Sequence, residues 1–365
     1  SGSFSYSSKY GSGYGTYLIG DAKQDLYGVK LDGMTYAAIF TGGTATYRSS
    51  KGAIALKDGD GNTLETVQGK GEVTSISAVW GFMSHGNATL NVLDGTRVNA
   101  EEAVFLYKSG STSIVFDEAV LSSGSGIILQ MMDNDDSIVG GNVNAFNTVF
   151  DEDAGWPSEN GNVTSAGAGS DGGGPSADQG VGPGPAPGDG GPGPAPGDGA
   201  PGPAPGGDGA PGPGPGTSSN AVTLTMTQGD YVGDLFNGTG YYGQAAVPLT
   251  VVIGEGATLE GAISLTETRH IDESGEQNTH FTINEYYYLG HVENRNYRNG
   301  SATAAVTVSG GAVWTVTKEC LLTTLTLGQG QIVGAKGATV ALMVDGKKVP
   351  LVAGSYVGEI ALRLE

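Results

Sequence analysis

The chain has one cysteine, no apolar run long enough to cross a membrane, and no lysine or arginine between Lys108 and Arg269. The single cysteine, Cys320, excludes an intramolecular disulfide, and its strand-like surroundings predict that it packs as a small buried hydrophobe. Since a membrane-spanning helix needs about 18 or more consecutive apolar residues, we expect no membrane insertion. The interval without basic residues holds 19 acidic ones and the formal net charge is −21, so a phosphate backbone would be repelled and we expect no nucleic-acid partner.

Helical periodicity is also missing from the sequence. No apolar stripe at positions i, i+3, i+4 and i+7 continues over three turns. Glycine, in contrast, accounts for 65 of the 365 residues, far above the usual level of about 7%. Many of these glycines separate short runs of Val, Ile, Leu, Thr and Tyr, which is typical of short strands joined by tight turns. The composition therefore predicts an all-β fold.

Two stretches of the first half of the chain align with each other at an offset of 24 or 25 residues. They are AVWGFMSHGNATLNVLDGTRVNA and AVFLYKSGSTSIVFDEAVLSS, and IILQMMDNDD begins a third copy. The aligned pairs are Ala78 with Ala103, Leu90 with Ile114, and Val92 with Phe116. This offset matches one coil of a parallel β-solenoid, in which short strands stack their inward side chains on those of the next coil. The alternative is an antiparallel β-sandwich, which also has short, regularly spaced strands.

Three segments carry a resemblance to a known group of proteins. GFMSHGNATLNVLDG, IILQMMDNDD and ETRHIDESGEQNTHFTINEYYYLGHVENRNYRNGSATAAVTVSGGAVWTVTKECLLTTLTL resemble the adhesin-like right-handed parallel β-helix proteins on the surface of anaerobic Gram-positive bacteria. The resemblance covers most of the chain outside its Pro-rich part. It implies a pectate-lyase-like β-helix and a secreted or cell-surface location, and it supplies no catalytic residues. The start at SGSFSYSS, without Met or a signal sequence, fits an excised piece of a secreted protein.

A Gly/Pro-rich tract built on the unit GPGPAPGDG interrupts the strand pattern. Glycine does not occupy every third position, which excludes a collagen triple helix. The tract favours extended polyproline II conformations and has no large apolar residues with which to form a core. We therefore predict β-helix coils in 1–165, a Gly/Pro-rich insertion or linker in 166–219, and further coils in 220–365 that continue the first set. The alternative is a linker between two separate β-helices.

The densest carboxylate cluster is the sequence DNDD, which contains Asp133, Asp135 and Asp136. Closely spaced carboxylates suit a hard cation, so these three residues are a candidate Ca²⁺ site, although the fold requires no cofactor. On a β-helix, grouped acids also fit a carbohydrate-cleaving acid and base pair. The third interpretation, a solvated turn, is the one that we favour.

Two other patterns point only weakly to metal binding. Asp58, Asp60 and Asn62 have the 1, 3, 5 spacing of an EF-hand loop, but the required Gly and Glu at positions 6 and 12 are missing, so we predict a hairpin turn. His270, His280 and His291 are spaced ten or eleven residues apart around Glu285. This spacing is not a zinc motif, and only stacking of successive coils would bring the three together.

A tyrosine-rich group offers a candidate ligand platform. Its members are Tyr286, Tyr287, Tyr288, Tyr241 and Tyr242. Because successive side chains of a strand point to opposite faces, Tyr287 faces away from its two neighbours. Exposed members could pack against sugar rings, whereas the alternative is aromatic packing under a loop.

These observations together predict a secreted or cell-surface structural or adhesion protein without catalytic activity. Its expected partner is a glycan or an extracellular-matrix or cell-surface ligand. One alternative is a polysaccharide lyase or hydrolase on a β-helix scaffold. The other is a subunit of an extracellular filament, which would self-associate through the β-helix ends because an uncapped end exposes unpaired backbone groups.

Overall fold

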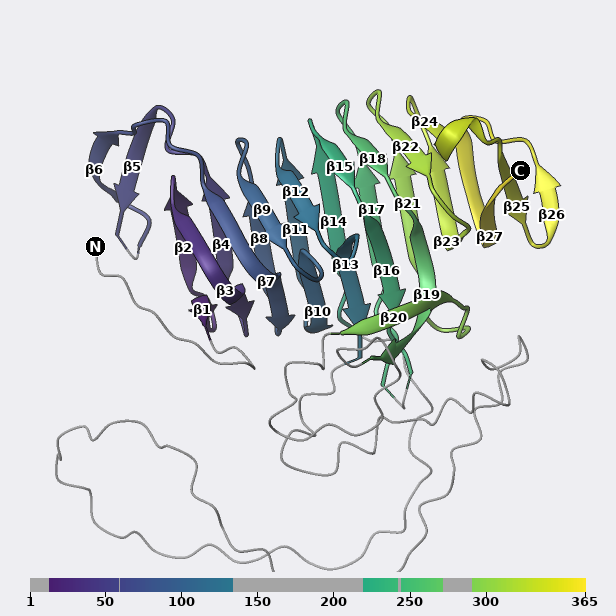
Figure 1. Ribbon diagram of the computed structural model, residues 1–365, viewed down its shortest axis with the longest axis horizontal. Helices are drawn as coiled ribbons and strands as arrows, with labels where there is room; N and C mark the ends of the chain where they lie inside the picture. The colour runs from purple at the N-terminus through teal and green to yellow at the C-terminus, as the bar shows by residue number, and fades with distance from the viewer. Residues whose placement is uncertain (1–12, 59, 134–218, 242–243, 272–290) are drawn as a thin grey trace, which may run out of the picture. The chain divides into compact units, whose positions relative to one another are not determined.

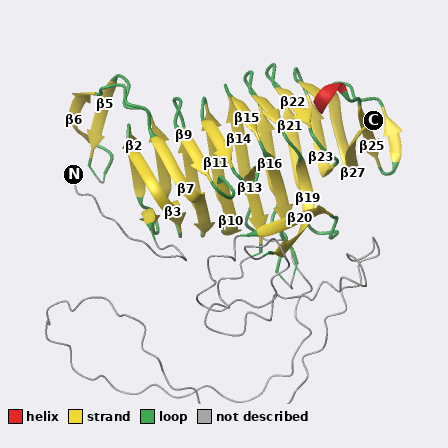
Figure 2. Ribbon diagram, in the orientation of Figure 1, coloured by secondary structure: helices red, strands yellow, loops and turns green. Residues whose placement is uncertain are grey.

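The computed structural model describes residues 13–58, 60–133, 219–241, 244–271 and 291–365, all of which belong to one compact unit. In these ranges the regular structure is β-strand apart from one three-residue 3₁₀ turn, η4 (Ala335–Gly337), drawn red in Figure 2. The strands lie side by side and follow the colour bar from purple to yellow (Figure 1). The all-β prediction is therefore confirmed for the described part of the chain.

Most strands belong to three sheets, listed here in spatial order. Sheet 1 contains β1 (Tyr14–Leu18), β3 (Lys30–Phe40), β7 (Ser75–His85), β10 (Phe105–Ser109), β13 (Ile127–Met132), β16 (Asp234–Gly238), β19 (Ile263–His270) and β20 (Val292–Asn296). Sheet 2 contains β2 (Lys23–Tyr27), β4 (Thr44–Arg48), β8 (Ala88–Val92), β11 (Thr112–Asp117), β14 (Val222–Thr227), β17 (Leu249–Ile253), β21 (Ala304–Val308), β23 (Cys320–Leu327), β27 (Gly354–Leu364), β25 (Val340–Val344) and β26 (Lys347–Val349). Sheet 3 contains β15 (Asp230–Val232), β18 (Thr258–Glu260), β22 (Val313–Val316) and β24 (Gln331–Gly334).

Two further strand pairs complete the described part. The strands β9 (Arg97–Ala100) and β12 (Val120–Ser123) pair in parallel with each other, and β9 also pairs with the first half of β7. The strands β5 (Ala53–Lys57) and β6 (Thr63–Gln68) form an antiparallel hairpin. Its turn contains Asp58, whose carboxylate accepts hydrogen bonds from the backbone N–H groups of Asp60 and Asn62. The predicted hairpin turn is therefore confirmed.

The three sheets are predominantly parallel, and the chain enters them in turn. The exceptions are the antiparallel pairs β19–β20, β23–β27, β25–β27 and β25–β26. From β8 the chain passes through β9 to β10 and then returns to sheet 2 as β11, the parallel neighbour of β8. In this pair Leu90 lies opposite Ile114, which confirms the predicted repeat offset of 24 residues.

One part of the sequence alignment is wrong. Ala78 was aligned with Ala103, but in the structure it pairs with Ala100 of β9. The reason is that β7 is a long strand serving two neighbours, β9 along its first half and β10 along its second. Ala103 lies in the connection between those two neighbours, where the chain changes direction and the strand spacing is not conserved.

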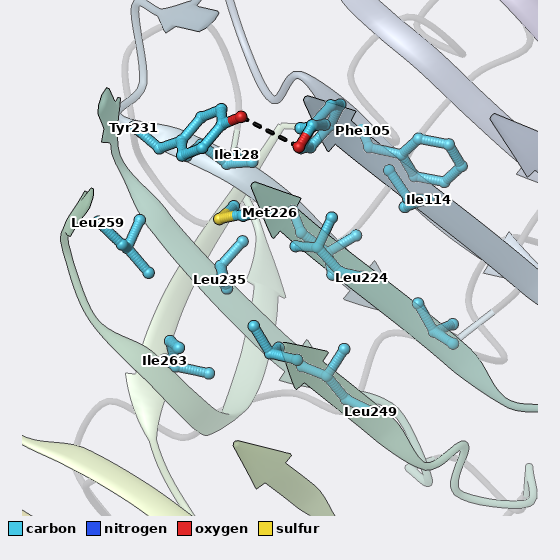
Figure 3. Packing of buried hydrophobic residues seen from close by; sticks show 14 of the residues in the cluster. Phe105, Ile114, Ile128, Leu224, Met226, Tyr231, Leu235, Leu249, Leu259 and Ile263 are labelled. Carbon is cyan, nitrogen blue, oxygen red and sulfur yellow. Dashed lines mark hydrogen bonds between the residues drawn. The ribbon is translucent and has the colours of Figure 1, made fainter. Parts of the chain in front are cut away.

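Side chains that point inward from sheet 2 form continuous ladders because parallel strands in register place like residues above one another. One ladder, from β4 to β23, contains Ala45, Leu90, Ile114, Leu224, Val251, Val306 and Leu325, all of which are fully or almost fully buried. Figure 3 shows Ile114, Leu224 and Leu249 on neighbouring strands of this sheet. Burial of each large aliphatic side chain contributes about 1.5–3 kcal/mol, so the ladders are the main source of stability.

The strands on either side of the longest undescribed stretch are neighbours in the same sheets. β11 pairs in parallel with β14, and β13 pairs in parallel with β16. The hydroxyl of Tyr231 in β15 also donates a hydrogen bond of 3.0 Å to the carbonyl of Phe116 in β11, the dashed line in Figure 3. Nearly all of the predicted insertion or linker, 166–219, lies outside the described residues.

Candidate functional site

Several polar side chains gather where neighbouring strands of sheet 1 end. Asp133 follows β13, Tyr241 lies shortly after β16, and Glu267 is near the end of β19. Because β13, β16 and β19 are consecutive parallel neighbours, their carboxyl ends lie at one edge of the sheet. Arg295 of β20 and Tyr297, directly after that strand, reach the same edge. We call these five residues the edge cluster.

Asp133 holds the chain that leaves β16. Its Oδ1 accepts a hydrogen bond of 2.9 Å from the backbone N–H of Gly240, and its Oδ2 accepts one of 2.7 Å from that of Tyr241. The side chain is buried. A carboxylate that accepts two backbone N–H groups orders a turn, so Asp133 has a structural task in addition to any role with a cation.

The other two members of the predicted Ca²⁺ site, Asp135 and Asp136, lie outside the described residues. Among the residues that are described, no group of three or more His, Cys, Asp or Glu side chains is placed to hold a metal ion. The Ca²⁺ site therefore stays a prediction.

Replacing Asp133 with alanine is expected to lower the free energy of unfolding by about 2–4 kcal/mol, because two charge-assisted hydrogen bonds are lost. Urea unfolding followed by circular dichroism, with Ca²⁺ and again with chelator, measures this change. A structural role predicts the same loss in both conditions. A loss confined to the Ca²⁺ condition would instead support the cation site. The exposed Asp32→Ala is the control, with an expected change within about 0.5 kcal/mol.

Tyr241 is the one predicted platform tyrosine in the described part of the chain. Its hydroxyl donates a hydrogen bond of 3.1 Å to the carbonyl of Thr266, and its ring lies 6.2 Å from that of Tyr297, centroid to centroid. Tyr242, Tyr286, Tyr287 and Tyr288 lie outside the described residues. Tyr241 is thus half-buried in a packed aromatic pair at the edge cluster.

Sequence reasoning missed three residues of the edge cluster, Glu267, Arg295 and Tyr297, and Glu267 is the most deeply buried of them. Its side chain is only 3% exposed, and its Oε2 is buried with no hydrogen-bond partner. Burial raises the pKa of this carboxyl to about 7, although the charge of Arg295 acts in the opposite direction. The sequence contains a usable signal, because alternation in AISLTET places Glu267 on the same side of the strand as Ile263 and Leu265.

Of the remaining predicted residues, the structure describes His291 and Cys320. His291 packs edge-on against Trp80, and its Nδ1 lies 3.6 Å from Oε1 of Glu102. His280, Glu285 and the side chain of His270 lie outside the described residues. Cys320 is fully buried, as predicted, and burial raises the pKa of its thiol to about 12, so it stays in the inert thiol form.

The outer side of sheet 2 is a second candidate, which we call the threonine face. Its residues alternate with the inward ladders from β4 to β23, and they are Thr44, Thr46, Thr89, Asn91, Ser113, Val115, Thr223, Thr225, Thr250, Val252, Ala305, Thr307, Thr324 and Thr326. None of these fourteen residues is charged. Neighbouring strands are about 4.8 Å apart, so the face repeats hydroxyl and methyl groups at that spacing.

Charged residues border this face at its N-terminal end. Lys23 of β2 pairs with Thr44, and Asp25 pairs with Thr46. Arg48 at the end of β4 and Asp117 at the end of β11 continue the same alternation, so charge also borders the fourteen uncharged residues at these two strand ends. The threonine face therefore suits an extended, uncharged ligand better than a charged one.

A polar hollow of about 790 Å³ lies near β25 and β27 and includes Arg298, Glu359 and Arg363 in its lining. Arg298 donates hydrogen bonds to the carbonyls of Leu322 and Ile360. Arg363 donates to Glu319 Oε1 at 2.6 Å. Both arginine side chains are therefore engaged in contacts that hold the strands of sheet 2 together. The hollow offers little further capacity to bind a ligand.

No family model, curated protein or solved structure matches this chain. Among the described residues, no helix is long and apolar enough to span a membrane.

Proposed function

We propose that the chain forms a right-handed parallel β-helix. Three features support this proposal: the chain enters the sheets in turn, strands in one sheet are parallel at the repeat offset, and inward ladders are continuous. The right hand follows from the general rule that about 98% of parallel crossover connections are right-handed. In this proposal each passage through the sheets is one coil, and coils bury their apolar sides only against their neighbours.

We further propose that the protein is a secreted or cell-surface adhesion protein without catalytic activity, and that it binds a neutral glycan through the threonine face. The single observation that carries this proposal is the array of fourteen uncharged side chains over seven parallel strands. Threonine hydroxyls can exchange hydrogen bonds with sugar hydroxyls, and threonine methyl groups can pack on sugar C–H faces. A stiff repeated surface favours many weak contacts along an extended polymer.

The binding test uses the intact chain on a neutral-polysaccharide array. Ser113 and Thr250 are exposed members of the threonine face, on β11 and β17. We expect Ser113→Lys and Thr250→Lys to weaken binding about tenfold or more, because each long charged side chain holds the ligand off the flat face. Val232→Lys is the matched control, since Val232 is 62% exposed in sheet 3 and lies outside the face. An equal loss in the control, or no loss in either face variant, would contradict the proposal.

Glu267 supports one alternative, a polysaccharide-cleaving enzyme. A buried carboxyl with a raised pKa is the usual form of the general acid in glycoside hydrolysis. Against this, the other described carboxyl of the edge cluster, Asp133, already accepts two backbone N–H groups. Supernatants from the binding assay distinguish the two functions. Release of oligosaccharides that is lost in Glu267→Gln would replace the adhesion proposal with the enzymatic one.

A further inference from the structure

Glu267 is buried at the point where an antiparallel strand is added to sheet 1. It lies opposite Arg295 in the β19–β20 pair, and its Oε2 has no hydrogen-bond donor. Elsewhere in the same pair a carboxylate has a conventional partner, because Arg269 and Glu293 form an ion pair. An ionised carboxylate at Glu267 would therefore have one oxygen held away from water without the hydrogen bond that normally offsets its desolvation.

The groups around Glu267 come from two connections and one strand. Tyr297 donates its backbone N–H to the carbonyl of Leu265, and the charge of Glu267 raises the pKa of Tyr297 in addition to the effect of burial. Tyr241 packs on Tyr297 from the chain after β16. Arg295 lies opposite Glu267 in the strand pair, and its positive charge acts to lower the pKa of Glu267. Tyr297 and Arg295 are thus near enough to interact electrostatically with the carboxyl, and Tyr241 packs behind Tyr297.

The opposite side of β20 is held by uncharged groups. Asn294 exchanges hydrogen bonds with the side chain of Gln130 at 2.6 Å and 3.1 Å, and Asn296 accepts one of 2.8 Å from Ser264. Asn296 also donates to the carbonyl of Glu319. These contacts do not titrate, so the pH dependence of this pair of strands rests on the side that carries Glu267.

The direction of the pH dependence follows from the position of the proton. Burial raises the pKa of Glu267 to about 7, from an ordinary value of 4.5. Between pH 4.5 and about pH 7, the carboxyl of Glu267 is protonated when β20 is packed on β19 and ionised when β20 has opened. Packing is therefore favoured at low pH and weakens as the pH rises through this window, and the loss continues until the packed carboxyl is itself ionised above about pH 7.

We propose that Glu267 is a protonation switch for the β19–β20 pair. When neutral, its carboxyl lets β20 and Tyr297 pack over the end of β19, and when ionised, it loosens them. The change is local, because β20 pairs with β19 alone among the described strands, whereas the inward ladders contain no titratable carboxyl. The pH thereby controls how far the hydrogen bonds of Asn294 and Asn296 are exposed to water.

The test is amide hydrogen exchange on the full chain, corrected for intrinsic rates. Between pH 6 and pH 8 we expect the protection of the β20 amides to fall about tenfold, as a shift from 4.5 to about 7 requires. The amides of β14 and β17 should keep their protection. Glu267→Gln should abolish the change in β20 and leave protection high at both pH values.

Glu293→Gln is the matched control, because it removes the same charge from the same pair of strands at an exposed position. The dependence should persist in it. The loss of the dependence in Glu267→Gln is what separates Glu267 from His291, which lies next to the start of β20 and close to Glu102. A dependence that survives Glu267→Gln, or none in the native chain, would overturn the proposal. If Glu267→Gln does not fold, carboxyl carbon NMR of the native chain decides: a Glu267 pKa near 4.5 refutes the switch.

Discussion

Trp314→Ala is expected to lower the free energy of unfolding by about 3–5 kcal/mol. Trp314 is completely buried in β22 of sheet 3, where it lies between Leu259 of β18 and Ile332 of β24. Its indole Nε1 donates a hydrogen bond of 2.9 Å to the carbonyl of Gly261. The substitution therefore leaves a large cavity and an unsatisfied buried carbonyl, and two of the principal destabilising mechanisms act together.

Urea unfolding followed by circular dichroism measures the effect of this substitution. The control is Val333→Ala on the neighbouring strand β24, where the side chain is 40% exposed and alternates with the inward Ile332. Its expected change is within about 0.5 kcal/mol. Similar losses for the two variants would mean that inward stacking in sheet 3 contributes little. Since β22 pairs with β18 and β24 in sheet 3, hydrogen exchange in Trp314→Ala should rise first in these three strands.

Gly110→Ala is the second substitution with a large expected effect, about 3–5 kcal/mol. Gly110 connects β10 to β11 with a φ of +86°, a conformation that disfavours a side chain. A Cβ at this position would lie 2.1 Å from the backbone carbon of Gly86, which occupies the equivalent connection before β8. Because the Cβ would meet the backbone of the stacked connection rather than the flexible end of a side chain, the clash can be relieved only by moving the main chain.

Gly95→Ala separates the two causes of this loss. Gly95 has a φ of +73°, but a Cβ there would meet no heavy atom within 4 Å. Only the conformational strain applies, so we expect a loss of about 1–2 kcal/mol. Thermal unfolding of the two variants gives the difference. Equal losses would mean that the close approach of Gly110 to Gly86 is relieved by movement of the backbone.

Much of the architecture is visible in local sequence patterns. In VTLTMT, the apolar residues Val222, Leu224 and Met226 alternate with threonines, and the structure buries all three. This works because a strand has a side-chain period of two, which depends only on local geometry. The repeat offset between Leu90 and Ile114 was predictable for the same reason. The alternating apolar residues of β8 recur in β11 after 24 residues, and the two strands are paired. The same alternation predicts that the threonines point away from the core. It does not show that threonines of different strands form one face.

Other features depend on residues that are far apart in the sequence. Ile114 and Leu224 are partners across the longest undescribed stretch, and no local pattern specifies the length of chain between two paired strands. Asp133 could be recognised as part of an acidic cluster, but its hydrogen bonds to Gly240 and Tyr241 follow from the pairing of β13 with β16. The alignment of Ala78 with Ala103 was wrong because one long strand pairs with two partners.

The sequence by itself therefore determined the all-β class, the in-and-out alternation, the repeat offset and the burial of Cys320, because each follows from short-range periodicity and from the hydrophobic effect. Only the tertiary structure decided which strands became neighbours, and with them the threonine face and the surroundings of Glu267. The physical reason is that the environment of a side chain is set by what packs against it. For Glu267, Arg295 and Tyr297 come from a later part of the chain, and it is burial in the folded protein that raises its pKa to about 7.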